Sequence, residues 1–250
     1  SRIYEYRNDG TAQNPVWTVV SENLANFYIG KNRADSFPSP ALLDMDGDSD
    51  LDLFFGEMDG NINVSENTGS ASAPQWTSYR DTFLSIDIGY NAAPAFVDID
   101  ADSDLDLVIG EEQNSYKYAN ETLNFYRNDN GNWKWETGNF AMPTDKRIDD
   151  PAPAFVDIDG DDDLDIFVGQ WSGTLTFLQN DGNAYEPVWT IVTDKYNNID
   201  IGESARPAFV DIDADGDFDL FIGNRYGTIY FYQNDGTKQT PAWKFITDQY

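Results

Sequence analysis

Short apolar runs alternate with acidic turns and Asn- or Gly-containing turns along the whole chain. The runs ALL, AFV, AFV and AFV each lead into an aspartate-rich stretch, and LFFG, LVIG, IFVG and LFIG follow those stretches. Runs of this length, rich in Val, Ile and Phe and bounded by Asn, Asp and Gly, are typical of β-strands. No long 3.6-residue periodicity predicts a helix. The chain is therefore predicted to be all-β.

The acidic stretch is a nonapeptide that occurs four times, as DMDGDSDLD, DIDADSDLD, DIDGDDDLD and DIDADGDFD. The copies begin at Asp44, Asp98, Asp157 and Asp211, at intervals of 54, 59 and 54 residues. Each unit reads as four strands: one before the nonapeptide, one after it, an alternating third strand, and a fourth that carries a Trp. That Trp is Trp76, Trp189 or Trp243, and Trp133 or Trp135 in the unit at 92–148. Repeated four-stranded units of this length predict the blades of a β-propeller, with the Trp as a packing residue between blades.

The N-terminal segment repeats only the second half of a unit. Residues 3–20 align without a gap with residues 229–246, so they supply a third and a fourth strand but no first or second strand. The last unit already has its own third and fourth strands. Three interpretations stay open: a partial fifth blade, the remnant of a longer array, or a hairpin that pairs with inner strands of another molecule, because an unpaired edge must be covered. We expect about five blades in one domain, with a half-unit at 1–30 and units at 38–90, 92–148, 151–202 and 205–250.

Five aspartates in one short turn repel each other unless a cation lies among them. Oxygen ligands in this number, without His or Cys, favour calcium, whereas magnesium gives up its water reluctantly. An EF-hand is excluded because its loop needs a Glu at position 12, where this chain has Phe55, Ile109, Val168 and Ile222. A solvated acidic turn without metal is the simpler alternative. We expect about four calcium ions, each clamping the turn between the first two strands of a unit.

PAFVDIDADSDLDLVIG and its siblings resemble the FG-GAP/VCBS repeat, the calcium-loop blade of integrin-α-type propellers and of many secreted bacterial proteins. The resemblance covers nearly the whole chain and implies that nonapeptide positions 1, 3, 5 and 9 bind calcium through side chains and position 7 through its backbone carbonyl. The side-chain ligands would be Asp44, Asp46, Asp48, Asp52, Asp98, Asp100, Asp102, Asp106, Asp157, Asp159, Asp161, Asp165, Asp211, Asp213, Asp215 and Asp219. The carbonyl positions would be Asp50, Asp104, Asp163 and Asp217. The glycine often found at position 6 is present only as Gly216; Ser49, Ser103 and Asp162 replace it, which predicts strain if φ is positive there.

The net charge of −30 argues against nucleic acid and anionic membranes as partners, since both require patches of Lys and Arg. No apolar stretch is long enough for a membrane span. The chain contains no cysteine, so it has no disulfide framework, and its calcium loops favour a secreted or cell-surface location, where calcium is millimolar.

Antiparallel order places the loops between strands 2 and 3 and the connections between units on one face, opposite the acidic turns. These segments vary most between units, and propellers usually bind through such loops. The candidate ligand-binding residues there are Asn91, Tyr116, Trp171, Arg206, Asn224, Arg225 and Tyr226. Exposed aromatics beside polar groups hold sugar rings or peptides; the alternative is that the same residues shield the axial opening.

Three functions remain open. The first is a non-catalytic binding or adhesion module for a carbohydrate or an extracellular protein. The second is a structural subunit of a cell-surface assembly that self-associates through residues 1–20. The third is a polysaccharide lyase or hydrolase that uses Glu57, Asp59, Glu111 or Glu112; it is disfavoured because the chain has no His or Cys for general-base or thiol chemistry.

Overall fold

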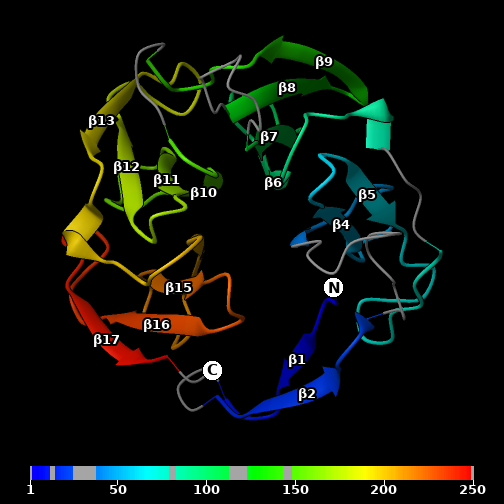
Figure 1. Ribbon diagram of the computed structural model, residues 1–250, viewed down its shortest axis with the longest axis horizontal. Helices are drawn as coiled ribbons and strands as arrows, with labels where there is room; N and C mark the ends of the chain where they lie inside the picture. The colour runs from blue at the N-terminus through cyan, green and yellow to red at the C-terminus, as the bar shows by residue number, and fades with distance from the viewer. Residues whose placement is uncertain are drawn as a thin grey trace.

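The computed structural model describes residues 2–11, 15–24, 38–78, 83–112, 123–143 and 148–248. Its strands form four antiparallel sheets arranged in a ring, together with a two-stranded sheet at the N-terminus (Figure 1). The expectation of an all-β propeller is thereby confirmed.

Each sheet is built from strands that are consecutive in the sequence, from the centre of the ring outward. Blade 1 contains β3 (Ser39–Leu43), β4 (Asp52–Gly56) and β5 (Ile62–Ser65). Blade 2 contains β6 (Ala93–Val97), β7 (Asp106–Gly110), β8 (Leu123–Asp129) and β9 (Asn132–Thr137). Blade 3 contains β10 (Ala152–Val156), β11 (Asp165–Gly169), β12 (Leu175–Asn180) and β13 (Trp189–Thr193). Blade 4 contains β14 (Arg206–Val210), β15 (Asp219–Gly223), β16 (Ile229–Asn234) and β17 (Trp243–Thr247). Two 3-10 turns, η2 (Phe83–Ser85) and η3 (Tyr196–Asn198), lie in connections between blades.

Blade 1 departs from the four-strand expectation. In the described residues its fourth position is a single bridge between Asn67 and Trp76 rather than a strand. The turn that leads from the third strand to this position still forms, because the Oδ1 atom of Asn67 accepts hydrogen bonds from the N–H groups of Gly69 and Gln75 at 3.0 and 2.9 Å. The fourth strands of blades 3 and 4 read WTIVT and WKFIT, whereas in blade 1 Trp76 is followed by Thr77 and the polar, weakly strand-forming Ser78. Pairing is therefore limited to the residues around Trp76.

The second strand of each blade is the most buried part of the fold. Every residue of β4, β7 and β11 is buried, because neighbouring blades cover both faces of these short apolar strands. Separate apolar clusters join blade 1 to blade 2, blade 2 to blade 3, and blade 3 to blade 4. The core therefore lies between blades rather than within any one of them.

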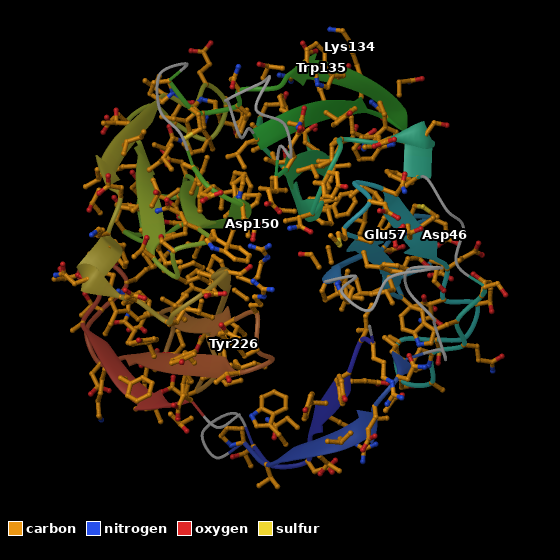
Figure 2. The ribbon with its side chains drawn as sticks, viewed as in Figure 1. Asp46, Glu57, Lys134, Trp135, Asp150 and Tyr226 are labelled. Atoms are coloured by element: carbon orange, nitrogen blue, oxygen red, sulfur yellow. The ribbon has the colours of Figure 1, made fainter. Side chains whose placement is uncertain are left out.

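The repeated Trp takes part in these clusters, as expected. Trp133 pairs with Asn128 in the position that Trp189 and Trp243 occupy in later blades, so Trp133 is the repeat residue. Its ring contacts Phe83, which precedes blade 2, at 5.7 Å between centroids. Trp135 instead lies 56% exposed on the outer strand β9, at the rim of the ring (Figure 2).

The N-terminal sheet is a hairpin of β1 (Glu5–Asn8) and β2 (Trp17–Ser21). Figure 1 shows it in the arc of the ring between blade 4 and blade 1. Ile3 and Leu24 beside the hairpin are buried with Leu53 and Phe55 of blade 1. The ring thus holds four blades and a hairpin with no inner strands among the described residues, which corresponds to the half-unit expected from the sequence.

Candidate metal centres

The four acidic nonapeptides form the turns between the first and second strands of the four blades. In each turn, one carboxylate oxygen from each of positions 1, 3 and 5 lies within 4.8 Å of the others. The groups are Asp44, Asp46 and Asp48; Asp98, Asp100 and Asp102; Asp157, Asp159 and Asp161; and Asp211, Asp213 and Asp215. Three converging carboxylates per turn are compatible with a bound calcium ion.

The backbone of the turn is folded around the first aspartate. The N–H of the residue at position 6 donates to Oδ2 of the first aspartate in all four copies, at 3.0 to 3.3 Å. This geometry gives position 6 a positive φ of 75°, 76°, 70° and 96° at Ser49, Ser103, Asp162 and Gly216. The predicted strain at the three non-glycine copies is therefore present.

The aspartate at position 9 ties the turn to the third strand. One carboxylate oxygen of Asp52, Asp106, Asp165 or Asp219 accepts the backbone N–H of an Asn in the third-strand region of its blade, at 2.8 to 2.9 Å. The Asn residues are Asn67, Asn128, Asn180 and Asn234. Burial raises the pKa of Asp165 to about 7, and of Asp106 and Asp219 to about 6. A cation beside these groups would offset that effect, and their part in binding it stays a prediction.

Several buried carboxylate oxygens in the turns have no hydrogen-bond partner, which supports the fit of a metal ion. At position 3 these are the Oδ1 atoms of Asp100 and Asp159. At position 7 they are the Oδ1 atoms of Asp50, Asp163 and Asp217, whose side chains are only 6 to 7% exposed. Leaving a buried charged oxygen without a partner is costly, whereas a bound cation would satisfy it. The family resemblance implied only the backbone carbonyl of position 7 as a ligand; its side chain is an additional candidate ligand.

Polar side chains of the third strand support position 3, although the repeat pattern did not single them out. Nε2 of Gln179 donates to Asp159 at 3.0 Å, and Nε2 of Gln233 donates to Asp213 at 2.8 Å. Arg127 occupies the same place in blade 2 and pairs with Asp100. The signal was available, because each of these residues directly precedes the Asn of the turn that follows the third strand. They fix the carboxylate that a metal ion would bind.

The opposite face is made by the loops between strands 2 and 3 and the connections between blades; we call it the loop face. These segments interlock through backbone hydrogen bonds, for example from Trp171 N–H to the carbonyl of Asp149 at 2.7 Å and from Ser204 N–H to the carbonyl of Trp171 at 2.9 Å. The guanidinium of Arg225 lies over the ring of Trp171, 4.9 Å from its centroid. Arg225 also pairs with Glu203 at 3.3 Å.

The remaining candidate ligand residues do not all gather at one place. Asn224 and Tyr226 share the turn that carries Arg225, and Tyr226 is 71% exposed. Asn91 donates instead to Glu112, and Nη2 of Arg206 donates to both carboxylate oxygens of buried Asp150 at 2.9 and 2.8 Å. Figure 2 shows Asp150 on the inner side of the ring. Tyr116 lies outside the described residues.

The carboxylates considered for catalysis lie in the same loops. Glu111 accepts a hydrogen bond from Asn124 at 2.5 Å, and burial together with the charges of Asp150 and Asp149 raises the pKa of Glu112. Among the described residues, no helix is long and apolar enough to cross a membrane.

A family model described as an FG-GAP-like repeat matches residues 44–109 and 157–222, which together make up more than half of the chain. Both matched segments begin at the first aspartate of a nonapeptide and end on the second strand of the following blade. No curated protein sequence matches the chain. The matched repeats, the blades and the acidic turns agree, and the chain belongs to the FG-GAP-like repeat family.

Proposed function

We propose that this protein is a calcium-stabilised, non-catalytic binding module of an extracellular protein, and that it binds a glycan on the loop face of blades 3 and 4. The observation that carries the proposal is the exposed ring of Tyr226, 71% exposed, beside the Trp171 and Arg225 pair. Aromatic rings next to a few polar groups are the usual means by which proteins hold sugars.

The turn that carries Tyr226 is well fixed. Oδ1 of Asn224 accepts the N–H groups of Tyr226 and Thr228 at 2.9 and 3.0 Å. The N–H of Arg225 donates to the carbonyl of Glu203 at 3.0 Å, which anchors the turn to the neighbouring connection. A ring presented from a fixed turn loses little conformational entropy when a ligand binds. This supports a binding role for the exposed aromatic ring.

Calcium has a structural role in this proposal. The acidic turns lie at the opposite ends of the strands from Tyr226, so a metal ion there would stabilise the blades rather than contact the ligand. Millimolar calcium outside cells would keep such sites filled. The family resemblance to secreted and cell-surface propellers also supports an extracellular location. A non-catalytic role fits the engagement of the loop-face carboxylates Glu111, Glu112 and Asp150 in hydrogen bonds with other residues of the chain.

The test is a glycan array screened in calcium with the wild-type chain and two Tyr→Ala variants. Tyr226→Ala removes the candidate contact and is expected to abolish glycan binding. Tyr185→Ala is the matched control, because Tyr185 is 70% exposed but lies in the turn between β12 and β13, on the face of the acidic turns. The Tyr185→Ala variant is expected to bind like wild type. Absence of glycan binding by the wild-type chain, or equal binding by the two variants, would contradict the proposal.

A further inference from the structure

The N-terminal hairpin has the structure of the outer half of a blade. Oδ1 of Asn8 accepts the N–H groups of Gly10 and Val16, both at 2.9 Å, as Oδ1 of Asn234 accepts those of Gly236 and Ala242 at 3.0 and 2.8 Å. Asn8 pairs with Trp17 as Asn234 pairs with Trp243, and both hairpins carry an irregularity three residues before the Asn. The hairpin is therefore the third and fourth strand of a fifth position.

The side of blade 4 that faces this hairpin is incompletely covered. Val210, at the end of β14, is 41% exposed, whereas its equivalents Val97 and Val156 are 6% and 3% exposed under the next blade. Phe221 is partly exposed, whereas its equivalent Phe167 is fully buried. An apolar cavity of about 360 Å³ lies here, lined by Tyr6 and Trp17 of the hairpin and by residues of blade 4 that include Phe209, Val210, Phe221 and Ile229. Among the described residues, no inner strands cover these side chains here as they do in the other blades.

The glycine that ends the second strand of each blade gives independent support. A Cβ atom on Gly56, Gly110 or Gly169 would lie 2.0, 1.9 or 2.1 Å from a backbone oxygen just before the first strand of the next blade. Those positions tolerate only glycine, because the next inner strand approaches so closely. A Cβ on Gly223 would meet nothing nearer than the Cβ of Arg206 in its own blade, at 3.8 Å. Gly223 therefore leaves room for a strand that the described residues do not contain.

The hairpin also presents the polar groups that hold an acidic turn in other blades. The N–H of Asn234 donates to position 9 of the nonapeptide in its blade, Asp219, at 2.8 Å. Within the part of the chain that the structure describes, no such carboxylate lies at the N–H of Asn8. Arg7 occupies the place of Arg127, which pairs with position 3 of its nonapeptide, Asp100. The side chain of Arg7 is 65% exposed and bonds only to its neighbour Asp9 among the contacts described, at 2.6 Å.

We propose that this space is the docking site for an inner β-hairpin of the repeat's own pattern, contributed by a polypeptide segment outside residues 1–250. The segment would consist of an apolar strand, an aspartate nonapeptide and a second apolar strand that pairs with the edge of β1 opposite β2, which no described strand covers. Its first strand fits against Gly223 and its acidic turn against Arg7 and the N–H of Asn8. The docked segment completes a fifth blade and adds a fifth acidic metal site.

A second copy of this chain fits the space less well. Its four inner hairpins are already paired within their own blades, and a net charge of −30 on each copy opposes close association. The charge of Arg7 is complementary to an isolated acidic turn. The docking site does not depend on the glycan proposed above.

The first experiment supplies the missing hairpin within the chain. Residues 203–228 are copied in front of Ile3, which is the equivalent of Ile229, and calcium content and melting temperature are measured. The extended chain is expected to bind one calcium ion more than the original chain and to melt at a higher temperature. An unchanged calcium content together with an unchanged melting temperature would overturn the proposal.

The second experiment tests the contact without relying on calcium. In the original chain, Gly223→Ala is expected to leave the melting temperature within about 2 °C of wild type because the site is open, whereas Gly169→Ala lowers it strongly because its Cβ would collide with Ala205. In the extended chain, Gly223→Ala in blade 4 is expected to lower the melting temperature as much as Gly169→Ala does. If it remains neutral there, the inner strand does not dock as proposed.

The third experiment uses a separate peptide of residues 205–226. It is expected to bind the original chain with one-to-one stoichiometry in calcium and to change the fluorescence of Trp17, and Arg7→Glu is expected to weaken binding at least about tenfold, which is about 1.4 kcal/mol. Equal affinity for wild type and Arg7→Glu would contradict the assigned orientation. Dimerisation of the original chain that is lost on deleting residues 2–11 would assign the edge to a second copy instead.

Discussion

The ion pair of Asp150 and Arg206 shows how single residues join neighbouring blades on the loop face. The carboxylate of Asp150 is buried, and it accepts hydrogen bonds from both Arg206 and the hydroxyl of Ser204, at 2.8 to 2.9 Å. Asp150 precedes blade 3, whereas Arg206 begins blade 4. The pair therefore connects two blades through groups that water cannot readily replace.

Arg206→Ala is expected to lower the free energy of unfolding by about 3 kcal/mol, because the buried charge of Asp150 is left without its partner. The double variant with Asp150→Asn should recover part of that loss. Arg225→Ala is the matched control: its pair with Glu203 is exposed and should contribute less than about 1 kcal/mol. Urea unfolding measures all three, and equal losses for Arg206→Ala and Arg225→Ala would contradict this account.

The sequence predicts residues that repeat better than residues that occur once. The positive φ at Ser103 could be anticipated because Gly216 stands at the same place in another copy. The pairing of Arg206 with Asp150 could not, because the two are 56 residues apart and meet only when the blades are in place. The role of Arg206 in ligand binding stays a prediction, but its guanidinium already binds the carboxylate of Asp150.

At the scale of elements, the turn between the first and second strands is the unit that metal binding should stabilise. Asp159 illustrates the balance of forces. Burial and then the charges of Asp161 and Asp157 raise its pKa, so the ionised group is unfavourable without a cation. The turn is therefore expected to be a source of instability without calcium and of stability with it.

Asp159→Asn keeps the size of the side chain but removes its charge. We expect the calcium content to fall by one ion and the melting temperature in calcium to fall, while stability in EDTA stays equal or rises because repulsion within the turn decreases. Asp181→Asn in the exposed turn between β12 and β13 is the control and should change neither quantity. A calcium content equal to that of wild type would show that Asp159 is not a ligand.

The repeat predicted where the strands lie, but it did not predict how many residues of each strand pair. The fourth strand was expected in every unit, yet blade 1 has only the bridge of Asn67 and Trp76 in the described residues. The Trp and the Asn turn occur in every copy, whereas the residues after the Trp, WTIVT and WKFIT in blades 3 and 4, set how far pairing extends. Similarly, the choice between Trp133 and Trp135 required the register of β8 and β9, which a length difference in the turn obscured.

At the scale of the whole molecule, apolar clusters join neighbouring blades into one folded ring. Charge repulsion within any of the four acidic turns therefore lowers the stability of the whole ring. The folded-state pKa values of Asp106, Asp165 and Asp219 are about 6, 7 and 6. These values lie above the ordinary pKa of an aspartate, about 3.9. At pH values between the ordinary and the raised pKa, the folded state therefore binds more protons than the unfolded state.

In EDTA, the free energy of unfolding is therefore expected to fall as pH rises from about 4 to about 7. In calcium the trend should reverse, since the ion binds the deprotonated carboxylates and protons compete with it. Melting temperatures across this range, with and without calcium, test both signs. Stability in EDTA that rises steadily over the same range would contradict the raised pKa values.

The ring arrangement was only partly predictable. The alignment of residues 3–20 with 229–246 identified a half-unit, but three placements were open because sequence does not show what lies beside an unpaired edge. The structure places the hairpin between blade 4 and blade 1, where Leu24 and Ile3 contact Leu53 and Phe55. Long-range closure of this kind depends on the accumulated geometry of all four blades.

The central claim is that calcium in the acidic turns stabilises the propeller. Thermal unfolding in calcium, in EDTA and in EDTA followed by magnesium tests it most directly. Each site adds about 2.7 kcal/mol when free calcium is about 100 times its dissociation constant, and about 2–4 °C accompanies each kcal/mol in a chain of this size. We therefore expect EDTA to lower the melting temperature by more than about 10 °C, with little recovery in magnesium. Superimposable unfolding curves in calcium and in EDTA would contradict the claim.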